Sequence, residues 1–474
     1  MLVEPQFRTK FSDTVWGMAA RIARMASFEE ALASAQAKVG LIPEASADAI
    51  LEACKNGLPT SNEIYEEAKI SGNPAIPFVN HLTSSVASKN STAAAHVHFG
   101  ATSQDLIDTA NMMALVEITD ALDSMLIQVS SDLRAMAMSH AKTPMVGRTL
   151  LQQATPITFG LKAALWGTAI TYVREQLKSV RRNDMAVQLG GSNGTLSVMI
   201  PYGPSVRADI AAQLGLADPD QCWHILRGRI LAVASSFAAI AGAAAKIAGD
   251  CILMMQTEVG ELHESAPGGS SSMLHKQNPV DALVPLAVLP LTAAHLSTIT
   301  IGQMQAHERG VGSWHSEWLT LPTLSTLTLA SVERLTKMVT GLKVNSARMW
   351  TNLSRTGGTL STEELSVSLM KQMGRQEAHD LIKSLLKQGD HATFADRILS
   401  NSKVSRIIPE DRLSEILNYK RPLDSAMREA QNLAKSIVHV KELIRPCSVC
   451  FAFSDRDPCA ICSHPGRERQ QLCV

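Results

Sequence analysis

Apolar residues recur every three or four positions over several long stretches of this 474-residue chain, a period typical of α-helices. From Ile230 to Leu262 no proline interrupts the pattern. This stretch predicts a helix of about 30 residues, on the order of 45 Å long. Similar stretches run from Asp105 to roughly Lys142, from Ile157 to about Asp184, and from Leu291 to Leu321, with another helix expected after Pro322. Four or five long helices predict a helical bundle.

The N-terminal part of the chain has shorter helical segments separated by turn-forming residues. Ser12 and Asp13 offer an N-cap to a helix that stops at Gly40, and residues 72–77 break the chain again. The pattern therefore predicts an all-α protein. We expect a small helical domain at 1–104, a long-helix bundle at 105–350, a C-terminal helical domain at 351–438 and a cysteine-containing tail at 439–474.

The charge balance excludes a strong attraction to polyanions. Lysine plus arginine equal aspartate plus glutamate at 44 each, so no global field favours nucleic acid or an acidic membrane surface. The N-terminus shows no basic segment followed by an apolar core, so we expect a cytoplasmic protein. The uncharged apolar run between Arg229 and Lys246 is shorter than the roughly 20 residues of a membrane span. These features favour a small-molecule partner.

Residues 268–279, Gly-Gly-Ser-Ser-Ser-Met-Leu-His-Lys-Gln-Asn-Pro, are the strongest candidate for chemistry. Paired glycines and three serines are most often a plain mobile loop. Here, however, Lys276 and Asn278 place a cation and an amide two residues apart at the end of the segment. This combination suits an anionic substrate.

A second cluster lies at residues 96–105, His-Val-His-Phe-Gly-Ala-Thr-Ser-Gln-Asp. Ser103 can be read simply as a helix N-cap with Thr102 as its neighbour, and Asp105 favours a first helical turn. An exposed helix N-terminus with two hydroxyl groups is also a good site for a carboxylate. The two interpretations are compatible.

Two further segments have both a structural and a functional interpretation. The Gly-Gly-Ser-Asn-Gly-Thr-Leu run at 190–196 lacks the lysine of a phosphate-binding loop, so we read it as a turn leaving a long helix. Residues 305–318 concentrate charge and aromatic rings within a predicted helical region, as a polar seam between subunits would. Arg309 in this segment is the candidate to reach a carboxylate, because guanidinium and carboxylate groups form two parallel hydrogen bonds.

Together these motifs resemble the fumarase/aspartase superfamily over roughly residues 3–438. The loop at 268–279 is similar to the G-S-S-x-M-P-x-K-x-N-P signature, and residues 98–109 are similar to H-x-G-A-T-S-Q-D-x-x-D-T. Residues 151–162 nearly match L-Q-Q-A-x-P-I-T-F-G-L-K of the 3-carboxy-cis,cis-muconate cycloisomerases, and adenylosuccinate lyases are also similar. The chain departs from the family at four positions: Leu150 replaces a histidine, Gly228 an acid, Leu274 a proline and Gln277 an arginine.

The resemblance implies a three-domain subunit that assembles into a homotetramer with shared active sites. It also implies addition–elimination beside a carboxylate without a cofactor. By position, the catalytic residues would be Ser270, Lys276 and Asn278, and the substrate-binding residues Thr102, Ser103, Gln152, Ser271 and Arg309. Since leucine cannot transfer a proton, the role of the missing histidine passes elsewhere. His98, His224 and His275 remain open candidates.

Three functions stay in competition. The first is cycloisomerase-type lactonisation in aromatic catabolism, and the second is a fumarate-releasing lyase acting on adenylosuccinate or another succinyl adduct. The third is an inactive scaffold that binds nucleic acid through its tail. The presence of Ser270, Lys276 and Asn278 argues against the third, and the neighbourhood of Leu150 favours the first.

The tail carries an independent signal. Cys447, Cys450, Cys459 and Cys462 have the C-x2-C, eight residues, C-x2-C spacing of a tetrahedral zinc site. Disulfides are a poor alternative in a cytoplasmic protein. The surrounding residues resemble the zinc finger of the bacterial recombination mediator RecR. We therefore expect a structural zinc in the tail, no cofactor in catalysis, and no dependable role in nucleic-acid binding.

Overall fold

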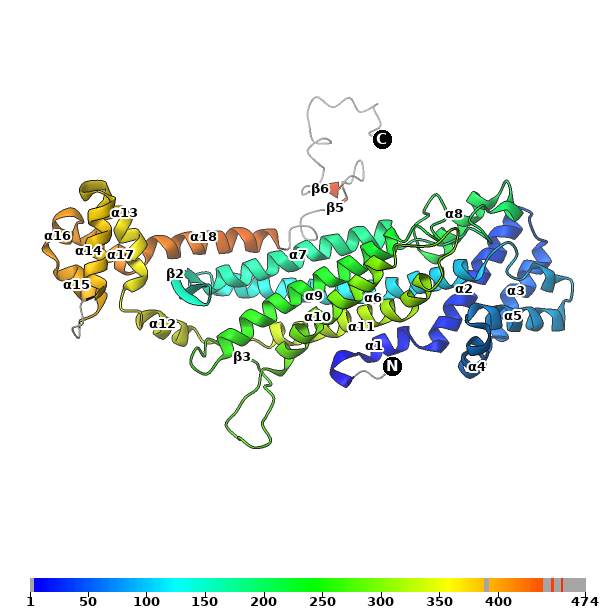
Figure 1. Ribbon diagram of the computed structural model, residues 1–474, viewed down its shortest axis with the longest axis horizontal. Helices are drawn as coiled ribbons and strands as arrows, with labels where there is room; N and C mark the ends of the chain where they lie inside the picture. Colours follow the sequence, from blue (N-terminus) through cyan, green and yellow to red (C-terminus); the bar gives the residue numbers. More distant parts are fainter. Residues whose placement is uncertain (1–3, 388–391, 438–444, 447–452, 455–474) are drawn as a thin grey trace, which may run out of the picture. The chain divides into compact units, whose positions relative to one another are not determined.

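The computed structural model describes residues 4–387, 392–437, 445–446 and 453–454, and these are mainly α-helical with three short antiparallel strand pairs (Figure 1). The chain forms two compact units. The first unit comprises Met1–Leu126, Tyr172–Gly249 and Val280–Lys337, and the second comprises Ile127–Thr171, Asp250–Pro279 and Met338–Val474. The division of the chain at residues 104, 350 and 438 stays a prediction.

Short helices form the N-terminal segment of the first unit. They are η1 (Pro5–Phe7), α1 (Lys10–Val15), α2 (Met18–Lys38), α3 (Glu44–Asn56), α4 (Ser61–Ser71), α5 (Ala75–Lys89) and η2 (Ala93–His96). The expected N-cap at Ser12 was wrong, because Thr9 caps α1 and accepts a hydrogen bond from the Ser12 N–H at 3.0 Å. The predicted break after α4 is confirmed, since Gly72 ends this helix in the left-handed region at φ 68°.

The long helices predicted from the apolar period are present. They are α6 (Ser103–Ser139), α7 (Phe159–Asn183), α9 (Gly228–Met255), α10 (Val280–Ile301) and α11 (Ser313–Thr340). One boundary was wrong: the chain does not break at Pro322, which lies inside α11, but at residues 302–312. Glycines and the positive φ of His307 favour the break there. Arg309 therefore lies in a connection, not in a helix.

Residues 144–158 form a strand pair that the helical pattern did not predict. β1 (Pro144–Thr149) and β2 (Gln152–Thr158) are antiparallel, and Thr149 pairs with Gln152 across the two-residue turn Leu150–Leu151. Both leucines have positive φ, 49° and 62°. This conformation disfavours residues with a Cβ and suits the turn of a β-hairpin.

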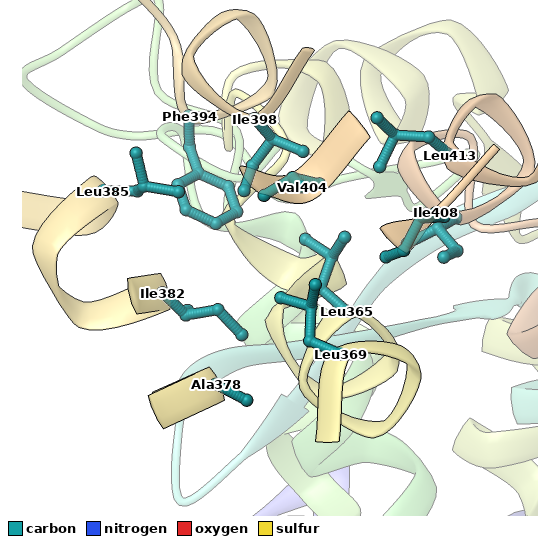
Figure 2. Close-up of a cluster of buried hydrophobic side chains, with 11 residues drawn as sticks. Leu365, Leu369, Ala378, Ile382, Leu385, Phe394, Ile398, Val404, Ile408 and Leu413 are labelled. Carbon is teal, nitrogen blue, oxygen red and sulfur yellow. The ribbon is translucent and has the colours of Figure 1, made fainter. Parts of the chain in front are cut away.

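The remaining elements complete the two units. They are η3 (Ser197–Met199), α8 (Gly203–Leu214), β3 (Leu262–His263), β4 (Lys343–Val344), α12 (Ser346–Ser354), η4 (Thr359–Ser361), α13 (Thr362–Met373), α14 (Arg375–Lys387), α15 (Phe394–Ser400), α16 (Ser402–Ile407), α17 (Glu410–Leu417), α18 (Lys420–Ser436), β5 (Arg445–Pro446) and β6 (Phe453–Ser454). Figure 2 shows how side chains of α13 to α17 converge on one apolar cluster that includes Leu365, Ile382 and Phe394.

Helices α9, α10 and α11 pack together in the first unit through Ala241, Val284, Val288 and Leu327. By length and composition alone, α9 and α10 would also suit a membrane span. In α9, however, the apolar stripe is buried within the unit, with Val233, Ala244 and Ile240 fully covered. The run between residues 229 and 246 is thus the interior helix that the sequence predicts.

Candidate functional site

The first turn of α6 is held by a buried carboxylate in the first unit. The Asp105 side chain is 0% exposed, and it accepts hydrogen bonds from the N–H groups of Gly190 and Gly191, both at 2.9 Å, and of Thr102 at 3.0 Å. The His224 imidazole completes this set, with Nε2 2.7 Å from Asp105 Oδ1. The four contacts fix the start of α6 against the 190–196 segment.

The charge state of His224 follows from this arrangement. Burial alone lowers its pKa, but the Asp105 carboxylate and the Cys222 side chain outweigh that effect and raise the pKa to about 9. The ring is therefore a cation at neutral pH, and Asp105 is its counter-ion. A buried carboxylate balanced in this way leaves the positive end of the α6 dipole available to a further anion.

Thr102 and Arg309 meet at this helix start. Arg309 Nη2 donates to Thr102 Oγ1 at 2.9 Å and to the Ser192 carbonyl at 3.0 Å. Ser103 is the first residue of α6, so Thr102, and not Ser103, occupies the N-cap position. A guanidinium group, two hydroxyls and the N-terminus of a 37-residue helix gather here. These groups are all suited to bind a carboxylate.

A second buried network supports the same region. Arg227 pairs with Asp108 at 2.7 Å and with Glu317 at 2.5 Å, and Trp314 Nε1 donates to Asp108 at 2.9 Å. The Arg227 and Asp108 side chains are 0% and 2% exposed. Arg227 is thus a positioning residue in the interior of the unit. Gly228, which replaces the family acid, is the first residue of α9.

The serine loop, residues 268–279, belongs to the second unit, and its neck is closed by backbone pairing. The Gly268 N–H donates to the Asn278 carbonyl at 2.8 Å, and the Asn278 N–H donates to the Gly268 carbonyl at 2.7 Å. Asn278 Nδ2 also donates to the Gly269 carbonyl at 2.9 Å. Residues 271–277 are exposed between these anchors. Asn278 therefore holds the base of the loop, and the rest of the loop has few contacts.

Ser270 lies at the first bend of this loop. Its Oγ accepts hydrogen bonds from the N–H groups of Met273 at 3.1 Å and Ser272 at 3.4 Å. These contacts give the hydroxyl a local role as the cap of the turn. They also place N–H donors beside the oxygen, where they would stabilise a negative charge.

A cavity of about 750 Å³ lies beside the loop in the second unit. Its lining includes His275, Lys276 and Asn278 from the loop and His263 from β3. Behind it, buried Glu261 accepts two hydrogen bonds from Arg148, at 2.8 and 3.0 Å, and one from Asn352 at 2.9 Å. The cavity thus combines cationic and titratable groups on an ordered base.

The other predicted residues have separate environments. Gln152 begins β2 and is exposed, next to the exposed turn residues Leu150 and Leu151. Of the three candidate histidines, His98 is paired with buried Glu29 at 2.5 Å, and His224 is paired with Asp105. Only His275 of the three lines the cavity of the serine loop.

Comparisons with known proteins agree with the fold and these motifs. A family model described as lyase matches residues 4–288. The 3-carboxy-cis,cis-muconate cycloisomerase of Bradyrhizobium diazoefficiens is 42% identical over 83% of this chain and 88% of its own length. The chain belongs to this lyase family of the fumarase/aspartase superfamily.

Two further relatives of the lyase family show the range of reactions. Nitrosuccinate lyase of Streptomyces davaonensis is 33% identical over 88% of this chain and 89% of that protein. The crystal structure of the 3-carboxy-cis,cis-muconate lactonizing enzyme from Pseudomonas putida has a TM-score of 0.84 and 32% identity, and the match covers 91% of this chain and 97% of that one. The predicted all-α, fumarase-like fold is therefore confirmed.

The tail of this lyase has its own match. A model of the four-cysteine zinc finger domain of RecR matches residues 444–464. Cys447, Cys450, Cys459 and Cys462 lie outside the described residues. Within the described ranges, no three histidine, cysteine, aspartate or glutamate side chains gather in a way that would hold a metal.

Reasoning from the sequence missed several residues that build this lyase's candidate site. It did not identify Asp105 as the acceptor that joins α6 to Gly190, Gly191 and His224, or His263 as part of the cavity lining. The glycine pair carried the available signal. A Cβ on Gly191 would stand 2.9 Å from the Gly100 carbonyl oxygen, so the two segments approach closely only because glycine lies there.

Proposed function

We propose that this enzyme catalyses addition–elimination at a carbon beside a carboxylate, as a 3-carboxy-cis,cis-muconate cycloisomerase in aromatic catabolism. The 42% identity to the Bradyrhizobium enzyme over most of both chains carries this proposal. The Thr102–Arg309 cluster and the cavity of the serine loop are chemically suited to a polycarboxylate substrate. The reaction would need no cofactor.

In this proposal Ser270 moves the proton at the carbon α to the carboxylate. In the elimination direction its oxygen takes that proton and the β carbon–oxygen bond breaks. In lactonisation a substrate carboxylate adds at the β carbon, and the same hydroxyl returns the proton to the α carbon. Lys276 stabilises the dianionic intermediate by its charge, while Asn278 keeps the neck of the loop closed.

Thr102, Ser103 and Arg309 would bind one substrate carboxylate, while Ser271 and Gln152 would contact the rest of the substrate. We assign the second proton transfer to His275, because the imidazoles of His98 and His224 are already engaged by carboxylates. Leu150 would contribute only shape. Closure of the exposed serine loop over bound substrate would exclude water from the reacting atoms.

A substrate panel tests this function. Purified protein is mixed separately with 3-carboxy-cis,cis-muconate, adenylosuccinate and other succinyl adducts, and the ultraviolet absorbance is followed. Cycloisomerase activity predicts loss of the diene absorbance with the first substrate and no fumarate from the others. Fumarate formation without any diene consumption would contradict the assignment.

The second candidate is a fumarate-releasing or related lyase acting on a succinyl compound. The 33% identity to nitrosuccinate lyase over most of both chains favours keeping it. It uses the same elimination chemistry with a different leaving group. The substrate panel separates the two, because only the lyase reaction produces a new fumarate-type spectrum.

We also propose that the enzyme is a cytoplasmic homotetramer whose active sites are shared between subunits. An apolar surface on α10 supports association, since four leucines and one isoleucine remain exposed there: Leu283, Leu286, Leu289, Leu291 and Ile301. Light scattering in detergent-free buffer should give four times the mass of the chain. A monomer under these conditions would contradict the assembly.

For the tail we propose a structural zinc bound by Cys447, Cys450, Cys459 and Cys462. The spacing of the four thiols and the match to the RecR finger support it. Elemental analysis of protein purified without chelators should find about one zinc per chain, and chelation should leave catalysis unchanged. The third candidate, an inactive nucleic-acid-binding scaffold, requires the opposite: no turnover, and binding that depends on the finger.

A further inference from the structure

Cys222 lies at a position in the first unit where the carboxylate network and the glycine-containing 190–196 segment meet. It is partly exposed, whereas the two other cysteines among the described residues, Cys54 and Cys251, are buried. A Cβ placed on Gly190 would stand 2.4 Å from Cys222 Sγ, and one on Gly194 would stand 3.3 Å from it. The sulfur therefore packs directly on the backbone of this segment.

The neighbour of the thiol is the His224 imidazole. This ring is 2% exposed and is bound through Nε2 to Asp105. Its Nδ1 is buried and has no hydrogen bond of ordinary geometry within the described residues, and Cys222 is close enough to affect the charge of the ring. A positively charged imidazole beside sulfur favours the thiolate, which is the nucleophilic form of cysteine.

The contacts of the 190–196 segment connect this thiol to the carboxylate cluster. Gly190 and Gly191 donate to Asp105, and the next residue, Ser192, accepts a hydrogen bond from the same Arg309 nitrogen that donates to Thr102. A group added to the Cys222 sulfur has no space on the side of Gly190. It would displace the backbone that orients Arg309.

We propose that Cys222 is a modification site for small hydroperoxides, and that its oxidation disables the Thr102–Arg309 cluster. The thiolate sulfur attacks one oxygen of the peroxide, the O–O bond breaks, and a sulfenic acid forms. The sulfur is oxidised by two electrons and the peroxide is reduced. The leaving alkoxide or hydroxide takes the proton of His224, which places His224 as a positioning and proton-donating neighbour of the thiol.

Labelling of the full-length chain tests the site without reference to turnover. The protein is treated with limiting iodoacetamide, or with hydrogen peroxide followed by a sulfenic-acid trap, and the peptides are mapped by mass spectrometry. Cys222 should react roughly tenfold or more faster than Cys54, whose pKa is raised by burial and by Glu29 and Glu30. Equal rates for Cys222, Cys54 and Cys251 would overturn the proposal.

A second readout tests the connection to the cluster, and it alone rests on the proposed function. Loss of turnover should follow the fraction of Cys222 modified, while Cys222→Ala and Cys222→Ser should keep turnover and resist peroxide. His224→Gln should slow labelling of Cys222. Full activity of a protein modified stoichiometrically at Cys222 would refute the connection, whereas an enzyme inactive before treatment would indicate failure of the proposed function.

Discussion

Asp105 in the first unit and Ser270 in the second lie in opposite surroundings. Asp105 is fully buried and receives four hydrogen bonds, so the residues that flank it, Thr102 among them, are fixed before any ligand arrives. Ser270 begins a loop that is paired only at its neck and is exposed from residue 271 to 277.

The difference assigns two kinds of work. A rigid, charge-balanced region can bind a carboxylate without reorganising, which lowers the cost of binding. An exposed loop with few contacts can move over the substrate and bring Ser270 and Lys276 to the reacting carbon. Substitutions in the loop should therefore affect turnover most, and substitutions around Asp105 should affect affinity and stability.

The largest expected effect is that of Ser270→Ala. Removing the proposed base should lower kcat by roughly 10²- to 10⁴-fold while substrate still binds, as is typical for a lost general base. Turnover and equilibrium binding are measured on the same substrate. Ser272→Ala is the matched control, since it shortens a serine two residues away and should change kcat little.

The local cap formed by the Ser270 hydroxyl needs its own control. Ser270→Thr retains an oxygen for the N–H groups of Ser272 and Met273, so it should preserve the turn. If Ser270→Ala and Ser272→Ala had equally small effects, the loop would be only structural, and the main reason to regard Ser270 as catalytic would be lost.

Arg309→Lys should have the next largest effect, on affinity. Lysine keeps the charge but cannot bond Thr102 and the Ser192 carbonyl with the same planar geometry. Loss of a charged hydrogen bond of about 1.5–3 kcal/mol corresponds to a roughly 10- to 150-fold weaker carboxylate contact. The change should appear in KM or Kd. An unchanged Kd together with a lower kcat would place Arg309 in the chemical step instead.

The ion pair of His224 and Asp105 should make stability depend on pH. The pKa of His224 is raised from 6.5 to about 9, so the folded protein binds the additional proton between these values. Its contribution to the free energy of unfolding is complete below pH 6.5 and is lost as pH rises through about 9, with an upper limit of about 3 kcal/mol. Denaturant unfolding from pH 6 to pH 9 measures this loss.

His224→Gln provides the reference for that measurement. Glutamine can still donate to Asp105 but does not titrate, so the fall in stability that His224 causes should disappear. A difference between the two proteins that grows as pH rises would have the wrong sign and would contradict the charge state assigned to His224.

The smallest effect concerns the turn of the β1–β2 hairpin. Leu150 and Leu151 occupy the left-handed region, which costs a residue with a Cβ roughly 1–2 kcal/mol. Leu150→Gly should therefore raise the free energy of unfolding by about 1 kcal/mol. Leu150→Ala removes the exposed side chain but keeps the Cβ, so it should not stabilise. Thermal unfolding compares the two, and equal melting temperatures would exclude backbone strain at Leu150.

How far the sequence predicts this molecule depends on the range of the interactions. The apolar period identified the long helices because α9 and α6 bury continuous stripes. It misplaced one boundary because Pro322 lies within α11, where packing outweighs the local cost of proline. It also missed the hairpin, since Leu150 and Leu151 are unusual in a turn that requires positive φ.

The candidate site divides in the same way. The serine loop and the Thr102-Ser103 pair are local motifs, so their residue types were visible in the chain. The partners of Asp105 were not, because Gly190 and His224 are 85 and 119 positions away. The location of Arg309 in a connection between helices likewise depends on the fold.

Hydrogen exchange tests the central contrast most directly. Ser270→Ala protein, which should bind substrate without turning it over, is compared with and without saturating 3-carboxy-cis,cis-muconate. The amides of Gly190, Gly191 and Thr102 should be protected in both states, whereas those of residues 271–277 should be protected only when substrate is bound. A loop already protected in the free protein, or one that gains no protection from substrate, would contradict the assignment of a fixed binding region and a closing catalytic loop.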